Sequence, residues 1–362
     1  MPLHFYIGWS LLPDFLMPVQ FVLAGVLVLT VSALLIPFGT FSRIFINDQV
    51  VIDRLVWAGS LMMGWFSSLL IFTILRDIVL FVPGFQAWST ESAYSVLALS
   101  ITVSFVGFFN ARRLAKVVHV DIPLSNLSPD LGGLTIAQIS DLHIGSTIKA
   151  GYVRNIVRRV NELDADIIAI TGDVVDGKVK QLVEEAAPLA DLHARYGVYI
   201  VTGNHEYYSG ADDWMDTFRQ MGMITLMNEH VVIEHKGAGL VLAGVNDYSV
   251  SRIDETQSSD PWKAISGSPD NIPKILLAHQ PRSATAAVEV GFDLQLSGHT
   301  HGGQFWPWNH FVRMQQPYTA GLHRLGQLWI YTSRGTGYWG PPKRFGAPSE
   351  ITFLRLQGVQ HS

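Results

Sequence analysis

The chain has 362 residues, no cysteine, and 30 acidic against 25 basic side chains. This length allows two or three domains, and the absence of cysteine excludes disulfides and thiolate metal ligands. Residues 1–117 hold six Lys/Arg and five Asp/Glu, which leaves 19 basic and 25 acidic residues for the remainder. This acidic balance argues against nucleic acid as the main partner, because phosphate backbones are bound by basic surfaces.

The first 117 residues are predicted to form a membrane anchor with three transmembrane helices, at about 19–39, 55–75 and 92–110. Each of these uncharged runs reaches the ~20 apolar residues needed to cross a bilayer; three buried core helices are the alternative. A cleaved signal peptide fits poorly, because residues 1–18 contain no Lys or Arg. Residues 78–90 are too short for a fourth span and contain Pro83-Gly84, which predicts an interfacial stretch.

The flanking basic residues predict the orientation. With three spans, Arg76 falls on one side, and the other side holds Arg43, Arg54, Arg112, Arg113 and Lys116. The positive-inside rule therefore predicts that the C-terminal part faces the cytoplasm and the N-terminus lies outside. A fourth span would reverse this orientation.

Residues 118–133 are predicted to be a linker, punctuated by Pro123 and Pro129, and residues 134–362 to form a domain. Helical spacing occurs over 150–163 and 179–189, with Pro188 expected to end or kink the second helix. Apolar runs typical of strands occur at Leu134–Ser140, Asp166–Thr171, Val198–Thr202, Leu240–Val245, Lys274–Ala278, Phe292–Ser297, Leu328–Thr332 and Glu350–Leu356. The first three strands and the two helices predict a parallel β-α-β-α-β unit.

Five polar motifs follow these apolar runs. They are Asp141-Leu142-His143, Gly172-Asp173, Gly203-Asn204-His205-Glu206, Ala278-His279 and Gly298-His299-Thr300-His301. Because ligands of open α/β sheets bind beyond the carboxyl ends of the strands, we expect all five motifs at one rim. Asp, His and Asn side chains are the kinds that hold hard or borderline divalent metals.

The motif set therefore predicts a hydrolytic site with two divalent cations about 3.5–4 Å apart, which share one carboxylate and one hydroxide. The cations would lower the pKa of the shared water and neutralise charge that develops during an in-line displacement at phosphorus. Mixed Asp/His/Asn ligands accept Mn, Fe, Zn or Mg, so the sequence does not distinguish the metals.

The motif segments together resemble the calcineurin-like metallophosphoesterase superfamily; they are Ile139–Gly145, Thr171–Asp176, Gly203–Glu206, His279 and Ser297–Gln304. Within it, Gly298–Gln304 and Ser333–Gly337 resemble the bacterial membrane-anchored branch. The resemblance covers roughly residues 134–356. It implies an α/β sandwich of two mixed β-sheets flanked by helices, behind an all-α transmembrane anchor in the inner membrane of a bacterium.

The resemblance also implies a role for each motif residue. The first metal would be held by Asp141, His143 and His301, the second by Asn204, His279 and His299, with Asp173 bridging both. His205 would not be a ligand; it would donate a proton to the leaving oxygen or stabilise the phosphoryl group. Asp176 would orient His205, although an Asp before Gly177 is often only a turn residue. Glu206 is expected to form local hydrogen bonds rather than to catalyse.

Three further features bear on the substrate. Arg334 is in reach of a substrate phosphate, with a structural salt bridge as the alternative. The aromatic residues of Phe305–Phe311 and Tyr338–Trp339 either belong to the core or border a substrate mouth facing the bilayer. Protein Ser/Thr phosphatases carry Arg-Gly after the second Asp of Gly-Asp-x-x-Asp, whereas here Gly177-Lys178 follows Asp176, which counts against phosphoproteins.

These features predict a membrane-anchored, metal-dependent phosphoric ester hydrolase that cleaves a phosphodiester, a pyrophosphate or a monoester. A lipid-linked substrate is preferred, because three spans exceed what a tether needs and a short linker keeps the site near lipid headgroups. One alternative is a membrane sensor or binding protein with an inactive metal domain, but no expected ligand is missing. Another is a transporter, but the charges lie at the borders of the spans rather than inside them. The sequence does not determine the oligomeric state.

Overall fold

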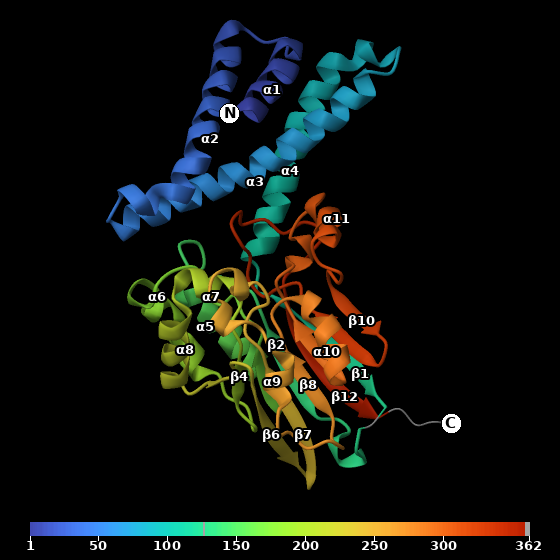
Figure 1. The fold of residues 1–362 in the computed structure, drawn as a ribbon. Coiled ribbons are helices and arrows are strands. Elements are labelled where there is room, and N and C mark those ends of the chain that lie inside the picture. The colour runs from blue at the N-terminus through green and yellow to red at the C-terminus, as the bar shows by residue number, and fades with distance from the viewer. Residues whose placement is uncertain (126, 359–362) are drawn as a thin grey trace. The chain divides into compact units, whose positions relative to one another are not determined.

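The structure is a computed structural model, and it describes residues 1–125 and 127–358 (Figure 1). The chain divides into two compact units. The first, here called the helix unit, comprises Met1–Arg112 and Gly340–Phe345. The second, the sheet unit, comprises Arg113–Trp339 and Gly346–Ser362.

The helix unit contains α1 (Pro2–Leu11), α2 (Val19–Phe45), α3 (Gln49–Leu80) and α4 (Ser89–Arg112). Three segments are long and apolar enough to cross a membrane: Val19–Ser42, Gln49–Leu80 and Phe85–Arg112. They contain the three predicted spans but run longer, and the second and third continue past charged residues such as Arg54, Arg76 and Glu91. The stretch predicted to be interfacial, residues 78–90, is divided between the end of α3, a turn, the 3₁₀ helix Phe85–Trp88 and the start of α4. The short helix α1 was not predicted.

Small residues and one ion cluster hold the helix unit together. A Cβ added to Gly39 in α2 would lie 2.7 Å from the carbonyl oxygen of Leu55 in α3, so glycine permits this close helix contact. The guanidinium of Arg76 is buried and pairs with Asp14 and Asp77. A buried charge requires such partners, because an unpaired one is costly to remove from water.

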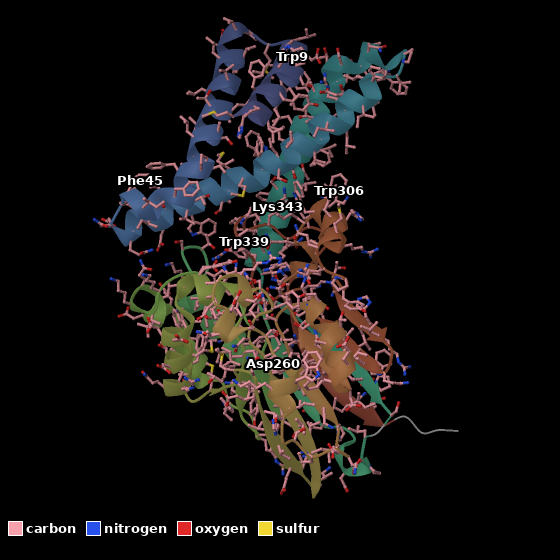
Figure 2. All side chains as sticks on the ribbon, in the orientation of Figure 1. Trp9, Phe45, Asp260, Trp306, Trp339 and Lys343 are labelled. Carbon is pink, nitrogen blue, oxygen red and sulfur yellow. The ribbon has the colours of Figure 1, made fainter. Side chains whose placement is uncertain are left out.

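The segment Gly340–Phe345 joins the helix unit although the chain on both sides of it belongs to the sheet unit. Lys343, labelled in Figure 2, donates from Nζ to the carbonyl oxygen of Gly64 at 2.7 Å. A Cβ added to Gly107 in α4 would lie 2.6 Å from Cγ of Lys343. Glycine at 107 is therefore what leaves room for the lysine stem.

The sheet unit is built from two six-stranded sheets, in the orders β1-β12-β2-β3-β4-β5 and β10-β11-β9-β8-β7-β6. The strands are β1 (Lys116–Leu124), β2 (Thr135–Ile139), β3 (Ile167–Ile170), β4 (Val198–Ile200), β5 (Ile224–Thr225), β6 (Glu229–His235), β7 (Ala238–Gly244), β8 (Lys274–Leu277), β9 (Leu294–Ser297), β10 (Gly321–Leu325), β11 (Leu328–Thr332) and β12 (Glu350–Gly358). The helices are α5 (Ala150–Asn161), α6 (Val179–Ala186), α7 (Asn204–Ser209), α8 (Ala211–Gln220), α9 (Pro261–Ile265), α10 (Ala284–Val290) and α11 (Trp308–Phe311). The predicted sandwich of two mixed sheets flanked by helices is confirmed.

The pairing of β2, β3 and β4 is parallel, as the β-α-β-α-β pattern predicts. Helix α6 ends at Ala186, and a 3₁₀ turn containing Pro188 follows, which agrees with the expected helix end. The predicted linker over 118–133 is wrong in its first part. Strand β1 occupies Lys116–Leu124 and pairs in parallel with β12. Pro123 obscured this strand in the sequence, but proline is tolerated on an edge strand such as β1.

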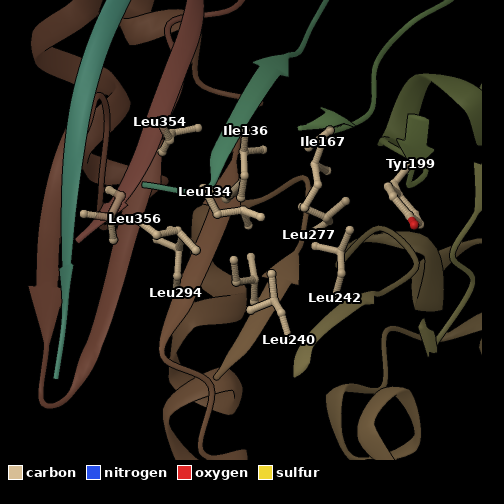
Figure 3. Packing of buried hydrophobic residues seen from close by; sticks show 14 of the residues in the cluster. Leu134, Ile136, Ile167, Tyr199, Leu240, Leu242, Leu277, Leu294, Leu354 and Leu356 are labelled. Atoms are coloured by element: carbon tan, nitrogen blue, oxygen red, sulfur yellow. The ribbon is translucent and has the colours of Figure 1, made fainter. Parts of the chain in front are cut away.

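The main core lies between the two sheets (Figure 3). Ile136 and Ile167 from the first sheet pack in one cluster with Leu240, Leu277 and Leu294 from the second, and all five are fully buried. Burial of each such side chain contributes about 1.5–3 kcal/mol relative to exposure. This packing fixes the carboxyl ends of β2, β3, β4, β8 and β9, where the polar motifs begin.

Candidate metal centre

The loops that leave these strand ends carry unusual backbone angles. Five motif residues that are not glycine have positive φ: Asp141 (54°), His143 (52°), Asp173 (53°), His299 (71°) and His301 (51°). This region is sparsely populated for side chains other than glycine, and each instance costs on the order of 1–3 kcal/mol. A cluster of strained backbone conformations is typical of functional sites, where surrounding contacts hold the side chains in a required geometry.

A first group of ligand atoms comes from the loops after β2 and β9. Nε2 of His143 lies 3.0 Å from Nε2 of His301. Nε2 of His301 lies 3.3 Å from Oδ1 of Asp141. Ligands at about 2.0–2.1 Å around a tetrahedral cation are separated by about 3.4 Å, so this spacing fits one ion. These three residues form one of the groups able to hold a metal.

A second group comes from the loops after β3, β8 and β9. Nε2 of His279 lies 3.1 Å from Oδ2 of Asp173 and 3.2 Å from Nδ1 of His299. Asn204, at the start of α7, is 9% exposed, and its Oδ1 has no hydrogen-bond partner among the described residues. Burying a carbonyl oxygen without a hydrogen-bond partner is costly unless a bound group satisfies it, and a cation fits that need.

Asp173 lies between the two groups. Its Oδ2 also faces Nε2 of His143 at 3.9 Å and Nε2 of His205 at 4.0 Å. Its Oδ1 accepts a hydrogen bond from the backbone amide of His205 at 2.9 Å. The backbone of α7 thus holds the carboxylate through Oδ1, and Oδ2 faces ligand atoms of both groups, as a shared ligand must.

Hydrogen bonds outside the ligand groups orient the imidazoles. Nδ1 of His279 donates to the carbonyl oxygen of Thr171 at 2.7 Å, which leaves the Nε2 lone pair for a metal. Oδ1 of Asp176 contacts Nδ1 of His143 at 2.9 Å and Nδ1 of His205 at 2.8 Å. The expected contact between Asp176 and His205 is present, and the additional contact to His143 was not foreseen.

These contacts perturb several pKa values. Burial alone would raise the pKa of Asp176, but the charges and hydrogen bonds of His143 and His205 hold it well below its usual range. Burial lowers the pKa of His205, yet the Asp176 hydrogen bond and the nearby carboxylates raise it to about 9. These carboxylates therefore favour the protonated form of the His205 imidazole.

Glu206 is fully buried and braces the same loops. Its Oε1 accepts from the amides of Val174 and Val175, and its Oε2 accepts from those of Asp173 and Gly203, at 2.7–3.2 Å. Burial and the Asp173 charge raise the pKa of Glu206 to about 7, against the effect of the backbone amides. The expectation that Glu206 makes local hydrogen bonds agrees with this geometry.

Two of the motif glycines are required because a larger side chain would clash with neighbouring atoms. A Cβ added to Gly298 would lie 1.9 Å from Oγ of Ser140 and 2.3 Å from Oδ2 of Asp141. One added to Gly203 would lie 2.2 Å from Oδ1 of Asp173. The candidate metal ligands therefore pack directly onto glycine backbone from the neighbouring motif.

The remaining predicted site features lie around this centre. Arg334 donates to Oε2 of buried Glu350 at 2.6 Å, so the structural salt bridge that the sequence left open is present. Phe305 is 8% exposed and belongs to the core, whereas Trp308 and Trp339 are 41% and 55% exposed. A role for Arg334 at a substrate phosphate stays a prediction.

Two polar residues near the rim were missed from the sequence. Asp247, three residues after the end of β7, is fully buried, and its two carboxylate oxygens accept from Nε2 of Gln280 at 3.1 Å while Oδ1 also accepts from the amide of Ser249 at 2.8 Å. Its position after the Leu240–Val245 apolar run was the available signal. Gln304, the last residue of the Gly-His-Thr-His-Gly-Gly-Gln segment, forms two hydrogen bonds with the backbone of Trp339.

Known proteins share this domain. A family model described as calcineurin-like phosphoesterase matches residues 134–303. A Danio rerio protein named "Transmembrane protein with metallophosphoesterase domain" is 37% identical over 273 residues, covering 73% of this chain and 62% of that protein. The "Uncharacterized metallophosphoesterase YkoQ" of Bacillus subtilis is 33% identical over 275 residues, covering 72% of this chain and 98% of that protein. The chain thus spans less than two thirds of the zebrafish relative, and similar proteins occur in both vertebrates and bacteria. The zebrafish name and the three apolar helices indicate membrane association.

Proposed function

Because this chain belongs to the calcineurin-like metallophosphoesterase family, we propose that it is a membrane-anchored phosphoester hydrolase that works with two divalent metal ions. The observation that carries this proposal is the arrangement around Asp173. Its carboxylate lies 3.1 Å from His279 in one group of ligand atoms and 3.9 Å from His143 in the other, and the buried Oδ1 of Asn204 has no hydrogen-bond partner in the part of the chain that the structure describes.

The residues present fit the metals that the family implies. Asp141, His143 and His301 form one group of possible ligands, and Asp173, His279 and His299 form another. In this proposal Asn204, whose buried Oδ1 has no partner among the described residues, completes the second site, and Asp173, which also faces His143 at 3.9 Å, serves both ions. Buried carboxylates need positive charge nearby, which two cations would supply. Bound divalent ions lower the pKa of a water and withdraw charge from phosphoryl oxygens. The mixed donor set suits Mn, Fe, Zn or Mg.

The chain's own residues supply the proton. His205, whose side chain is 18% exposed, is reachable by substrate and would donate from Nε2 to the leaving oxygen. Asp176 holds Nδ1 of the same ring and so keeps the other nitrogen directed toward the rim. In this scheme Asp176 is a positioning residue.

For substrate and location, we favour a lipid-linked phosphoester or pyrophosphate over a soluble metabolite, at a cell membrane with the sheet unit in the cytoplasm. The three apolar segments and the distribution of basic residues support this choice. A membrane sensor with an inactive metal domain is less well supported, because every ligand position holds a competent side chain.

The test is hydrolysis by the purified full-length chain after chelation and after return of Mn²⁺, Zn²⁺, Mg²⁺ or Fe²⁺. The substrates should be a chromogenic monoester, a chromogenic diester, a phospholipid and a nucleotide-linked lipid. Asp173→Asn should abolish turnover, whereas the exposed control Asp216→Asn, whose partner is Arg219, should not. Full turnover by a verified metal-free preparation would refute the proposal.

A further inference from the structure

Two exposed aromatic rings flank the proposed proton donor. The ring of Trp339 lies 5.9 Å from that of His205 at an interplanar angle of 74°. The ring of Tyr208, in α7, lies 5.5 Å from the same His205 imidazole at an interplanar angle of 68°. Trp339 is 55% and Tyr208 66% exposed, although large aromatic side chains are mostly buried in folded proteins. The two rings therefore do not serve the core.

The backbone of Trp339 is fixed to the candidate metal centre. Its amide donates to Oε1 of Gln304 at 2.9 Å, and its carbonyl accepts from Nε2 of Gln304 at 2.9 Å. Gln304 is 8% exposed, has φ of 56°, and ends the turn that starts at the ligand candidate His301. A buried side chain in an uncommon conformation thus holds an exposed tryptophan beside His205; Trp339 is labelled in Figure 2.

We infer that Trp339 and Tyr208 bind an apolar surface on the leaving group of the substrate, and that Gln304 is the positioning residue for Trp339. This inference rests on the proposed function. The attacking water forms a bond to phosphorus and loses a proton to solvent, the P–O bond to the leaving group breaks, and its electron pair stays on the leaving oxygen. That oxygen takes the proton from His205, which is reprotonated from solvent. The first atoms beyond that oxygen must then pass the rings that flank the imidazole.

The chemistry of the rings selects the class of leaving group. Aromatic faces and edges gain from contact with apolar or planar groups, and stacking is worth about 1–3 kcal/mol in other aromatic binding sites. Inorganic phosphate or a methyl ester is too small to use them. The preferred substrate therefore carries a hydrocarbon or aromatic surface directly beyond the scissile bond, which agrees with a lipid-linked phosphoester.

Inhibition by phosphonates tests this inference on the full-length protein with Mn²⁺. The inhibition constants of inorganic phosphate, methylphosphonate, phenylphosphonate and 1-naphthylmethylphosphonate are measured against a chromogenic diester. The wild type should bind the naphthyl compound more tightly than the methyl compound. Trp339→Ala should reduce this preference by about 5- to 160-fold, the loss expected for one stacking contact. Its inhibition constant for inorganic phosphate should stay unchanged, which also shows that the protein is folded.

Matched variants separate binding from positioning. Tyr208→Phe keeps the ring and should keep the preference, whereas Tyr208→Ala should reduce it. Gln304→Ala should also reduce the preference for the naphthyl compound, because the Trp339 ring remains but its backbone loses the two hydrogen bonds to Gln304. Trp262→Ala removes an equally exposed tryptophan, 54% exposed on α9, and should change nothing.

Several results would overturn the inference. An active wild type without naphthyl preference, or an unchanged preference in Trp339→Ala, would refute the aromatic site alone. Equal weakening of phosphate and naphthyl binding in Trp339→Ala would mean that the ring supports the metal centre instead. An unchanged preference in Gln304→Ala would refute its positioning role. A wild type inactive with every metal would refute the proposed function, and this inference with it.

Discussion

Replacing Glu206 by glutamine tests whether one buried carboxylate holds the loops of the metal centre. Each carboxylate oxygen accepts hydrogen bonds from two backbone amides, those of Val174 and Val175 at Oε1 and those of Asp173 and Gly203 at Oε2. Glutamine presents an NH₂ group in place of one oxygen. In either orientation of the side-chain amide, two buried backbone amides therefore lose their acceptor and face another donor.

The cost follows from these two amides. A buried donor left without its partner costs about 1–3 kcal/mol, so the substitution should destabilise the sheet unit by about 2–6 kcal/mol. In a domain of this size, each kcal/mol shifts Tm by about 2–4 °C, so the apparent Tm should fall by at least about 4 °C. Because the Asp173 amide is among the four, Mn²⁺ affinity should fall as well.

The assay is thermal unfolding of the full-length protein in detergent, followed by tryptophan fluorescence, with Mn²⁺ affinity measured at a temperature where both proteins are folded. Glu184→Gln, an exposed substitution in α6, is the control and should match the wild type. If Glu206→Gln unfolded and bound Mn²⁺ like the wild type, the four hydrogen bonds would not support the centre and the reasoning would be refuted.

Three further predictions concern the loops, the proton and the membrane. Gly298→Ala should abolish hydrolysis and metal binding, because the added Cβ would lie 1.9 Å from a side-chain oxygen, whereas Gly151→Ala has open space and should be neutral. Asp176→Asn removes a carboxylate that raises the pKa of His205 to about 9, so the alkaline limb of kcat/KM against pH should move to lower pH; a limb that stays in place would count against His205 as the donor. A reporter fused after Ser362 should behave as cytoplasmic; a reporter active only outside the cytoplasm would contradict the predicted orientation.

The fold was readable from the sequence where a strand is buried on both faces. The runs that became β2, β3, β4, β8 and β9 are short and apolar, which is typical of central parallel strands. The strands that were missed lie at or next to the sheet edges. β1 contains Pro123, β5 has only two residues, and β6 and β10 contain charged and imidazole side chains that interrupt their apolar runs. Edge strands bury less surface, so their sequences carry a weaker pattern.

For the site, the sequence predicted which residues gather but not which of them contact one another. Residue type and order after each strand predicted that motifs of one sheet lie together, because the carboxyl ends of parallel strands share a rim. The motifs after β2, β3 and β4 belong to one sheet and those after β8 and β9 to the other, so their meeting also depends on how the two sheets pack. Contacts between distant segments were not readable. Nothing near Asp176 in sequence indicates that it meets His143, and nothing near Gln304 indicates that it meets the backbone of Trp339. Such pairings depend on how loops fold back in three dimensions, which spacing along the chain does not record.

The shared carboxylate of Asp176 gives the centre a property that separate role assignments miss. One oxygen, Oδ1, contacts both His143, a ligand candidate for the first ion, and His205, the proposed proton donor. Any change that draws Asp176 toward one ring weakens its hold on the other. Under the proposed roles, metal binding at the first position and proton donation would therefore be energetically coupled through Asp176 Oδ1. Residues that act as such a unit give non-additive kinetic effects, so losses measured at His143 and His205 separately would count the same contact twice.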